Sequence, residues 1–175
     1  MQTSKHIFLI GFMGSGKTYW GKKLSRAIEL PFLDLDDLIS SKVGKSIADF
    51  FQDSGEAAFR NMEVLALQEI SRLPTPHIIA TGGGTPCFFD NLEYMNKSGT
   101  TIYLKVSPEI LVARLRSETN TRPLLKATPA DKLLQTIQEL LKARETFYTK
   151  ATFTIPQIDT SDDILPLLIQ VSNRL

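Results

Sequence analysis

The chain has 175 residues, of which 42% are hydrophobic and 22% are charged, a composition typical of one globular domain over 1–175. Its formal net charge of +1 argues against a nucleic-acid-binding protein built on a broad basic surface, and its apolar runs are far shorter than the roughly 20 residues of a membrane helix. The single cysteine, Cys87, excludes an intramolecular disulfide framework and suits a reducing cytoplasm, so we expect a cytoplasmic protein with no nucleic-acid or membrane partner.

The first predicted strand, at 6–11, runs directly into a glycine-rich loop. This loop, GFMGSGKT at 11–18, fits the spacing G-x-x-x-x-G-K-[ST] of a phosphate-binding loop, and a predicted helix at 17–29 follows it. Glycines let the backbone curl so that its N–H groups face a polyphosphate, and the positive end of the helix dipole points at the same place. Lys17 would reach the β- and γ-phosphates and Thr18 would offer a hydroxyl to Mg²⁺. The loop therefore predicts nucleotide binding.

The second predicted strand, at 32–35, carries Asp34 and is followed closely by Asp36. Alternation along an extended strand would put these two carboxylates on the same side. Beside a triphosphate, one carboxylate can hold the water shell of Mg²⁺ while the other orients or deprotonates the attacking hydroxyl. Alternatively, Asp36 or Asp37 caps the helix that follows, a role that does not explain Asp34 inside the apolar strand.

Helices are predicted next at 47–53 and 56–72, and the second of them carries Arg60. Val64 and Leu67 lie below Arg60 on the same face, so the arginine leans inward. An inward guanidinium matches a substrate carboxylate, because its fork of N–H donors binds that group with two hydrogen bonds. The alternatives are an ion pair, for which Glu63 is available at i+3, or a side chain that snorkels at the edge of the core.

The third predicted strand, at 77–81, ends in Gly82, Gly83 and Gly84. Three glycines allow a backbone floor on which a polar substrate lies close to main-chain N–H groups. A tight turn before Pro86 would need one or two glycines but not three. Because strands alternate with helices, we expect a parallel sheet in a three-layer α/β sandwich, with ligands at the carboxyl ends of the strands.

The rest of the chain is predicted to hold helices at 88–97, 107–117, 129–148 and 161–174, and strands at 101–106 and 152–155. Segment 117–129 has no sustained period, and it is either a solvated connection or a lid that carries Arg122 over the nucleotide. In the helix at 129–148, Arg144 falls on the apolar stripe, where an arginine is costly unless it meets an anion. No His, Cys or carboxylate set has metal-ligand spacing, so Mg²⁺ bound with the nucleotide is the one metal we expect.

Taken in order, these motifs resemble the shikimate kinase family. The resemblance rests on six stretches between residue 7 and about residue 155, namely GFMGSGKT, FLDLDDLI, GKSIADFFQDSGEAAFR, TGGG, TRPLL and KARETFY. It implies a P-loop kinase fold of the nucleoside-monophosphate-kinase type, with five parallel strands in the order 2-3-1-4-5, a shikimate-binding region at about 34–63 and a lid at about 117–127. It also implies transfer of the γ-phosphate of ATP to the 3-hydroxyl of shikimate, with Mg²⁺ as cofactor, and we expect a monomer.

The resemblance also implies roles for individual residues. The implied catalytic residues are Lys17, Asp36 and Arg122. The implied nucleotide-binding residues are Gly14, Ser15, Gly16, Lys17, Thr18, Tyr19 and Arg122. The implied shikimate-binding residues are Asp36, Arg60, Gly82, Gly83, Gly84 and Arg144, with Phe51, Phe59 and Glu63 around the same pocket. Mg²⁺ would be held by Thr18 and, through water, by Asp34, while Arg114 or Arg116 and the stretch DTSDDI are candidates for the adenine.

Two other functions are compatible with parts of this pattern. A gluconate-type kinase also phosphorylates a small hydroxy acid, although the D-x-D, F-R and R-P-L-L motifs argue against it. A degenerate kinase that binds ATP as a regulatory module would be expected to have lost Lys17, Asp36 or Arg122, and the chain keeps all three. ATP-dependent phosphorylation of shikimate is therefore the favoured prediction.

Overall fold

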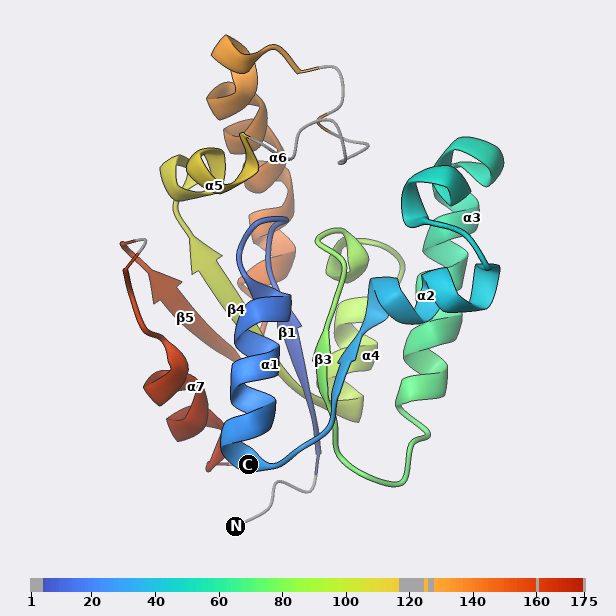
Figure 1. The fold of residues 1–175 in the computed structure, drawn as a ribbon. Helices are drawn as coiled ribbons and strands as arrows, with labels where there is room; N and C mark the ends of the chain where they lie inside the picture. The colour runs from blue at the N-terminus through green and yellow to red at the C-terminus, as the bar shows by residue number, and fades with distance from the viewer. Residues whose placement is uncertain (1–4, 117–124, 126–127, 160, 175) are drawn as a thin grey trace.

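A five-stranded parallel sheet forms the centre of the computed structural model, which describes residues 5–116, 125, 128–159 and 161–174 (Figure 1). Its strands are β1 (His6–Ile10), β2 (Phe32–Asp34), β3 (Ile78–Ala80), β4 (Gly99–Val106) and β5 (Phe153–Gln157). Their order across the sheet is β2-β3-β1-β4-β5, which confirms the predicted order. All five residues of β1 are buried, as an apolar strand in the middle of a sheet covered on both faces should be.

Seven α-helices cover the two faces of the sheet within the described residues (Figure 1). They are α1 (Lys17–Ile28), α2 (Leu35–Val43), α3 (Ile47–Ile70), α4 (Asn91–Ser98), α5 (Pro108–Leu115), α6 (Leu133–Tyr148) and α7 (Leu165–Ser172), with short 3₁₀ turns at Thr85–Cys87 and Ala130–Lys132. Alternate residues of β1 face opposite layers: Ile7 and Leu9 pack toward α1 and α7, whereas Phe8 and Ile10 pack toward α3, α4 and α6. The predicted three-layer sandwich is confirmed.

The two helices predicted at 47–53 and 56–72 form one helical run that is broken at Gly55. This glycine has φ 79° and ψ 172°, a left-handed backbone conformation that glycine adopts without steric cost. The break separates the first two turns of α3 from the longer part that carries Arg60 and Glu63. Helix α2, in contrast, lies in a stretch for which no helical range was predicted, and it begins directly after β2.

The carboxyl ends of β1, β2 and β3 point the same way, because the strands are parallel. Residue Leu9 of β1 stands beside Ala80 of β3, and Asp34 of β2 stands beside the same alanine. The three loops that leave these strands therefore start at one edge of the sheet, as predicted. In the described part of the chain, no helix is both long and apolar enough to cross a membrane.

Candidate active site

The loop between β1 and α1 curls because its glycines adopt positive φ angles. Gly11, Gly14 and Gly16 have φ of 144°, 78° and 87°, a range that other residues adopt only at a cost. Helix α1 begins at Lys17, and no side chain among the described residues caps its first turn. Uncapped N–H groups and the positive end of the helix dipole therefore face the inside of the loop, the arrangement that binds phosphate.

The ammonium group of Lys17 lies inside this curl rather than in solvent. Its side chain is only 8% exposed, and Nζ donates hydrogen bonds to the carbonyl oxygens of Gly11 and Phe12 at 2.8 and 2.9 Å. Ser15 is completely buried beneath the same turn. The loop thus holds a buried positive charge in a fixed place, where it can act on a phosphate group with little screening by water.

Asp34 connects the phosphate-binding loop to helix α2. Its Oδ2 accepts a hydrogen bond from the Thr18 hydroxyl at 2.7 Å, and its Oδ1 accepts one from the backbone N–H of Asp36 at 3.1 Å, so Asp34 is the N-cap of α2. The alternative in which Asp36 or Asp37 caps the helix is therefore wrong, and so is the argument that a capping role does not explain Asp34. A hydroxyl and a carboxylate side by side are the hard oxygen ligands that Mg²⁺ prefers, so these two residues fit the predicted metal.

Asp36 lies in the first turn of α2 and not on an extended strand. The reason given for its alignment with Asp34, the alternation of side chains along a strand, is therefore wrong, because the helix begins one residue earlier. Its side chain nevertheless lines the same cavity as Asp34. This cavity has a volume of about 470 Å³, and its lining includes Lys17, Thr18, Asp34, Asp36, Gly82 and Gly83. Three loops thus supply one site, as the sequence predicted.

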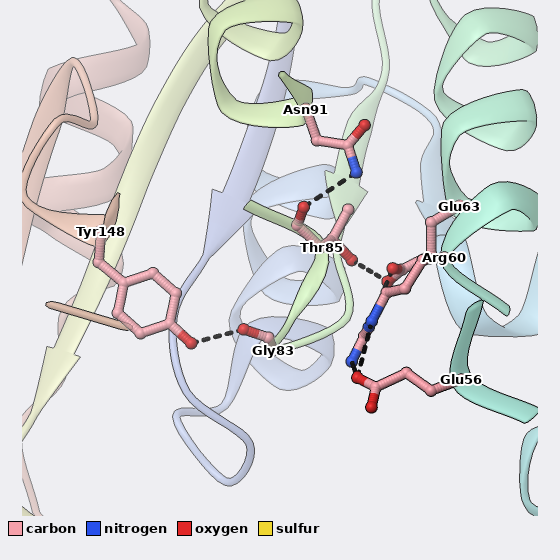
Figure 2. Close-up of polar contacts among 7 residues, drawn as sticks. All are labelled: Glu56, Arg60, Glu63, Gly83, Thr85, Asn91 and Tyr148. Carbon is pink, nitrogen blue, oxygen red and sulfur yellow. Dashed lines mark hydrogen bonds and ion pairs between the residues drawn. The ribbon is translucent and has the colours of Figure 1, made fainter. Parts of the chain in front are cut away.

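Arg60 is buried and held from two sides by carboxylates on its own helix (Figure 2). Its Nη2 and Nε donate to Glu56 Oε1 at 2.8 and 3.2 Å, and its Nη1 donates to Glu63 Oε2 at 3.0 Å. The guanidinium also lies 4.0 Å from the ring centre of Phe88. These contacts fix the direction of the guanidinium and use three of its five N–H donors.

Glu63 is completely buried, which is rare for a carboxylate. The Thr85 hydroxyl and Arg60 both donate hydrogen bonds to it, one to each oxygen. Burial raises the pKa of Glu63 above its usual value, while Thr85 and Arg60 act in the opposite direction. The i+3 ion pair that the sequence offered as an alternative for Arg60 is therefore present. It holds the arginine next to Gly84, just beyond the cavity edge formed by Gly82 and Gly83.

Arg144 projects from α6 toward the same edge and is 9% exposed. Its guanidinium carbon lies 5.4 Å from the ring centre of Phe12, in the loop after β1. Its Nη1 is buried and has no hydrogen-bond partner among the described residues. A buried guanidinium nitrogen without an acceptor is costly, so this is the place where a bound anion would stabilise the protein.

Gly82, Gly83 and Gly84 are needed for space rather than for backbone conformation, since none of them has a positive φ. A Cβ on Gly82 would lie 2.9 Å from Glu63 Oε1, one on Gly83 would lie 3.0 Å from the backbone nitrogen of Met13, and one on Gly84 would lie 2.7 Å from Arg60 Nη1. Each glycine thus leaves room for another part of the site. This explains all three glycines, where a simple turn would explain only one or two.

We expect Gly84→Ala to displace the Arg60 guanidinium, because the new methyl group would overlap it. Glu56, Glu63 and Phe88 hold that guanidinium, so it cannot move without losing contacts. Steady-state kinetics should show an increase of about tenfold or more in KM for the carboxylate-bearing acceptor, the cost of about 1.4 kcal/mol in lost contacts. KM for the nucleotide should change by less than about twofold, and an unchanged acceptor KM would contradict this role of the glycine.

The structure adds residues that the sequence did not single out (Figure 2). The hydroxyl of Tyr148, on α6, donates to the Gly83 carbonyl oxygen at 2.5 Å, and Asn91 donates to the Thr85 carbonyl oxygen at 3.0 Å. Tyr148 lies on the buried face of α6 with Ile137 and Leu141, and this apolar pattern carries no sign of its hydroxyl's partner. These contacts fix the backbone of the glycine segment from α6 and α4.

A second cavity, of about 480 Å³, lies beside the phosphate-binding loop. Of the two arginines considered for the adenine, Arg114 lines this cavity, and it donates to the Gly14 carbonyl oxygen at 3.0 Å and to Gln157 Oε1 at 3.1 Å. Gln157 in turn donates to the Ser15 carbonyl oxygen at 3.1 Å, a contact that the sequence did not indicate. The rest of the lining includes Tyr19, Trp20, Lys23, Ser161, Asp162 and Asp163. Part of the stretch DTSDDI therefore lies here.

Arg122 and most of the predicted lid at 117–127 lie outside the described residues. Within the described part of that stretch, Leu125 is completely buried and packs in the core layer on the α3, α4 and α6 side of the sheet. The lid and the role of Arg122 stay predictions.

Comparison with known proteins identifies relatives along nearly the whole chain. A family model described as shikimate kinase matches residues 13–171. A shikimate kinase from Parabacteroides distasonis is 46% identical over 162 residues, which cover 91% of this chain and 93% of the relative. The crystal structure of shikimate kinase from Bacteroides thetaiotaomicron is similar, with a TM-score of 0.83, 38% identity and coverage of 97% of this chain and 94% of the other. A shikimate kinase from Acinetobacter baumannii, in complex with shikimate, gives a TM-score of 0.86 and 31% identity over 99% of this chain and 97% of the other.

Proposed function

The chain belongs to the shikimate kinase family and is an ATP-dependent kinase of shikimate, and from this premise we propose which of its residues carry the reaction. The observation that carries the proposal is the buried Nη1 of Arg144, which lacks an acceptor among the described residues. It lies near Gly83, which lines the same cavity as Lys17, Thr18 and Asp34. Arg144 is not among the residues that line this cavity, but its guanidinium lies beside Gly83, which does line it, so an arginine suited to a carboxylate is next to the groups for a polyphosphate.

The phosphate half of the site is formed by the loop after β1. The N–H groups of this loop and of the first turn of α1 bind the phosphates of ATP, and the Lys17 ammonium neutralises charge on the transferring group. Mg²⁺, when bound, supplies further positive charge at the phosphate oxygens. The Thr18 hydroxyl would hold it directly and the Asp34 carboxylate through water, a donor set whose oxygens lie 2.7 Å apart here.

The acceptor half of the site is formed by α2, α3, α6 and the glycine segment. Arg60 and Arg144 bind the shikimate carboxylate, and Gly82, Gly83 and Gly84 lie beneath its ring. Two cations on opposite sides of one carboxylate fix the orientation of the ring, so that a single hydroxyl faces the γ-phosphate. Two kinds of N–H donor support this assignment. They are the donors of Arg60 that do not bind Glu56 or Glu63, and Nη1 of Arg144, which has no partner among the described residues.

Asp36 orients the 3-hydroxyl and accepts its proton during transfer. A new bond forms between this oxygen and the γ-phosphorus, the bond from that phosphorus to the β,γ-bridging oxygen breaks, and the products are 3-phosphoshikimate and ADP. Because the transition state of phosphoryl transfer is loose, positioning by Asp36 contributes more than its basicity. Arg122 neutralises the transferring phosphoryl group.

We also propose that the protein acts as a cytoplasmic monomer.

The test is release of ADP from ATP and Mg²⁺ with three acceptors measured in parallel: shikimate, gluconate and a nucleoside monophosphate. Turnover with shikimate alone supports both halves of the site. Turnover with gluconate or the nucleoside monophosphate instead would agree with the residues assigned to ATP and contradict those assigned to shikimate. Binding of ATP without turnover of any acceptor would favour the degenerate, regulatory alternative.

A further inference from the structure

A groove of about 490 Å³ lies between α6, the start of α5 and strands β4 and β5, and Arg144 does not line it. Strand β5 forms one edge of the sheet (Figure 1). Its Ile155 packs toward α1 and α7, whereas Thr154 and Pro156, which point to the opposite face, are exposed. The groove exists because the helices on that face leave the last strand uncovered. None of the residues assigned above to ATP or shikimate lines it.

Besides Gln157, Tyr103 is a buried polar residue among those that line this groove. It is 1% exposed, and its hydroxyl has no hydrogen-bond partner among the described residues. Its ring packs on Tyr148 with the ring centres 5.0 Å apart, so the side chain cannot easily turn away. Burial, and then the nearby Glu145, raise the pKa of Tyr103. The hydroxyl therefore stays protonated and is a buried donor that lacks an acceptor, a feature that points to a ligand.

The charges of the groove lie around its rim. Lys105 forms an ion pair with Glu145 at 2.8 Å, and Lys142, one helical turn before Glu145, is exposed and makes no ion pair with any described residue. Two cations and one carboxylate give the groove a net charge of +1. Leu141 and Pro156 contribute apolar wall, and Ile158 at its edge is 83% exposed, unusual for so large an apolar side chain.

We propose that this groove binds a small planar hydroxy acid, with the ring on the apolar wall, the carboxylate at Lys142 and the hydroxyl at Tyr103. A ligand hydroxyl can accept from the Tyr103 hydroxyl and donate to the Glu145 carboxylate at the same time, which neither a carboxylate nor a methyl group could do. A single negative charge balances the uncompensated Lys142. The volume is within the range of small-molecule sites, about 300–1,000 Å³, and exceeds what one ring requires.

The probe for this site is 4-hydroxybenzoate, added to ¹⁵N-labelled protein and followed by the movement of backbone amide signals. We expect signals of Val106, Lys142 and Ile158 to move, and those of Gly82–Gly84 to stay. Benzoate, which lacks the hydroxyl, and 4-hydroxybenzamide, which lacks the charge, should each bind about threefold to tenfold more weakly.

Three variants test the assigned contacts, none of them in the catalytic site. Lys142→Gln should weaken the binding of 4-hydroxybenzoate about threefold to tenfold. The control is Lys132→Gln, which replaces an exposed lysine just before α6 and should leave this binding unchanged. Gln138→Trp, which fills the groove from its exposed side, should abolish binding. Tyr103→Phe should reduce the preference for 4-hydroxybenzoate over benzoate, because only the contact of the ligand hydroxyl with Glu145 is left. It should keep its thermal stability because the lost hydroxyl has no partner among the described residues.

Several outcomes would overturn the proposal. They are the absence of any signal movement at about 10 mM probe, movement confined to Gly82–Gly84, unchanged binding in Lys142→Gln or Gln138→Trp, or an undiminished preference for the hydroxyl in Tyr103→Phe. Each variant should keep its rate of shikimate phosphorylation within about twofold of the parent, which shows that it is folded.

Discussion

Replacement of Lys17 by alanine should lower kcat by about 10³-fold or more. Phosphoryl transfer depends on positioning and on stabilisation of charge, and loss of one cation at the transferring group has effects of about 10³–10⁵ in related systems. Lys17 is suited to this role because its ammonium is buried and held in place by two carbonyl oxygens of its own loop. Steady-state measurement of ADP release at saturating ATP and shikimate gives kcat directly.

The control for this variant is Lys22→Ala, which removes an exposed lysine from the same helix. Its kcat should stay within about twofold of the parent. Loss of the Lys17 ammonium leaves the carbonyl oxygens of Gly11 and Phe12 without this donor, so the thermal midpoint of Lys17→Ala must be measured alongside activity. A folded Lys17→Ala protein with near-normal kcat would contradict the assigned role.

Replacement of Arg144 by alanine should act on shikimate binding rather than on ATP binding. Removal of one member of a buried charge pair costs about 2–4 kcal/mol, so KM for shikimate should rise by about 30-fold to 10³-fold. KM for ATP should change little, because Lys17 is held by carbonyl oxygens of its own loop and Arg144 meets that loop at the Phe12 ring. KM for shikimate in Arg144→Lys should lie between the values of the parent and of the alanine variant, since lysine restores the charge without the planar fork.

Stability measurements separate this effect from damage to the fold. The Nη1 of Arg144 has no partner among the described residues, so the alanine variant leaves no acceptor stranded at that atom. Its thermal midpoint without shikimate should therefore fall by only a few degrees, and the stabilisation that shikimate gives the parent protein should be reduced. An unchanged KM for shikimate, or a normal shift of the thermal midpoint on adding shikimate, would contradict the carboxylate contact.

The parts of the fold that could be predicted are those whose cause is local in the sequence. The glycines of the loop after β1 require positive φ, so their spacing predicts the turn, and the apolar run before them predicts a buried strand. The break in α3 at Gly55 was also indicated, as two separate helical patterns. Parallel strands that alternate with helices then bring the strand ends to one edge, which predicts where the site lies.

The parts that could not be predicted depend on contacts between distant segments. Asp34 belongs to a strand, as expected, but it is the last residue of that strand, so it also caps α2 and binds Thr18. The need for three glycines at 82–84 follows from side chains of α2, α3 and the 3₁₀ turn and from the backbone of the first loop, none of which their own stretch reveals. The hydrogen bonds of Tyr148 and Gln157 likewise join distant segments, and only the fold shows which carbonyl oxygens they bind.

The order of the strands also has a consequence for folding during synthesis on the ribosome. Strand β1 is the first to be synthesised, yet both of its neighbours come much later, β3 at Ile78 and β4 at Gly99. At a synthesis rate of about 5–20 residues per second, this apolar strand waits roughly 3–20 s for its partners. During that interval an apolar strand, buried in the folded protein, has no partner strand. A chaperone that shields β1 would therefore act before β3 and β4 are available.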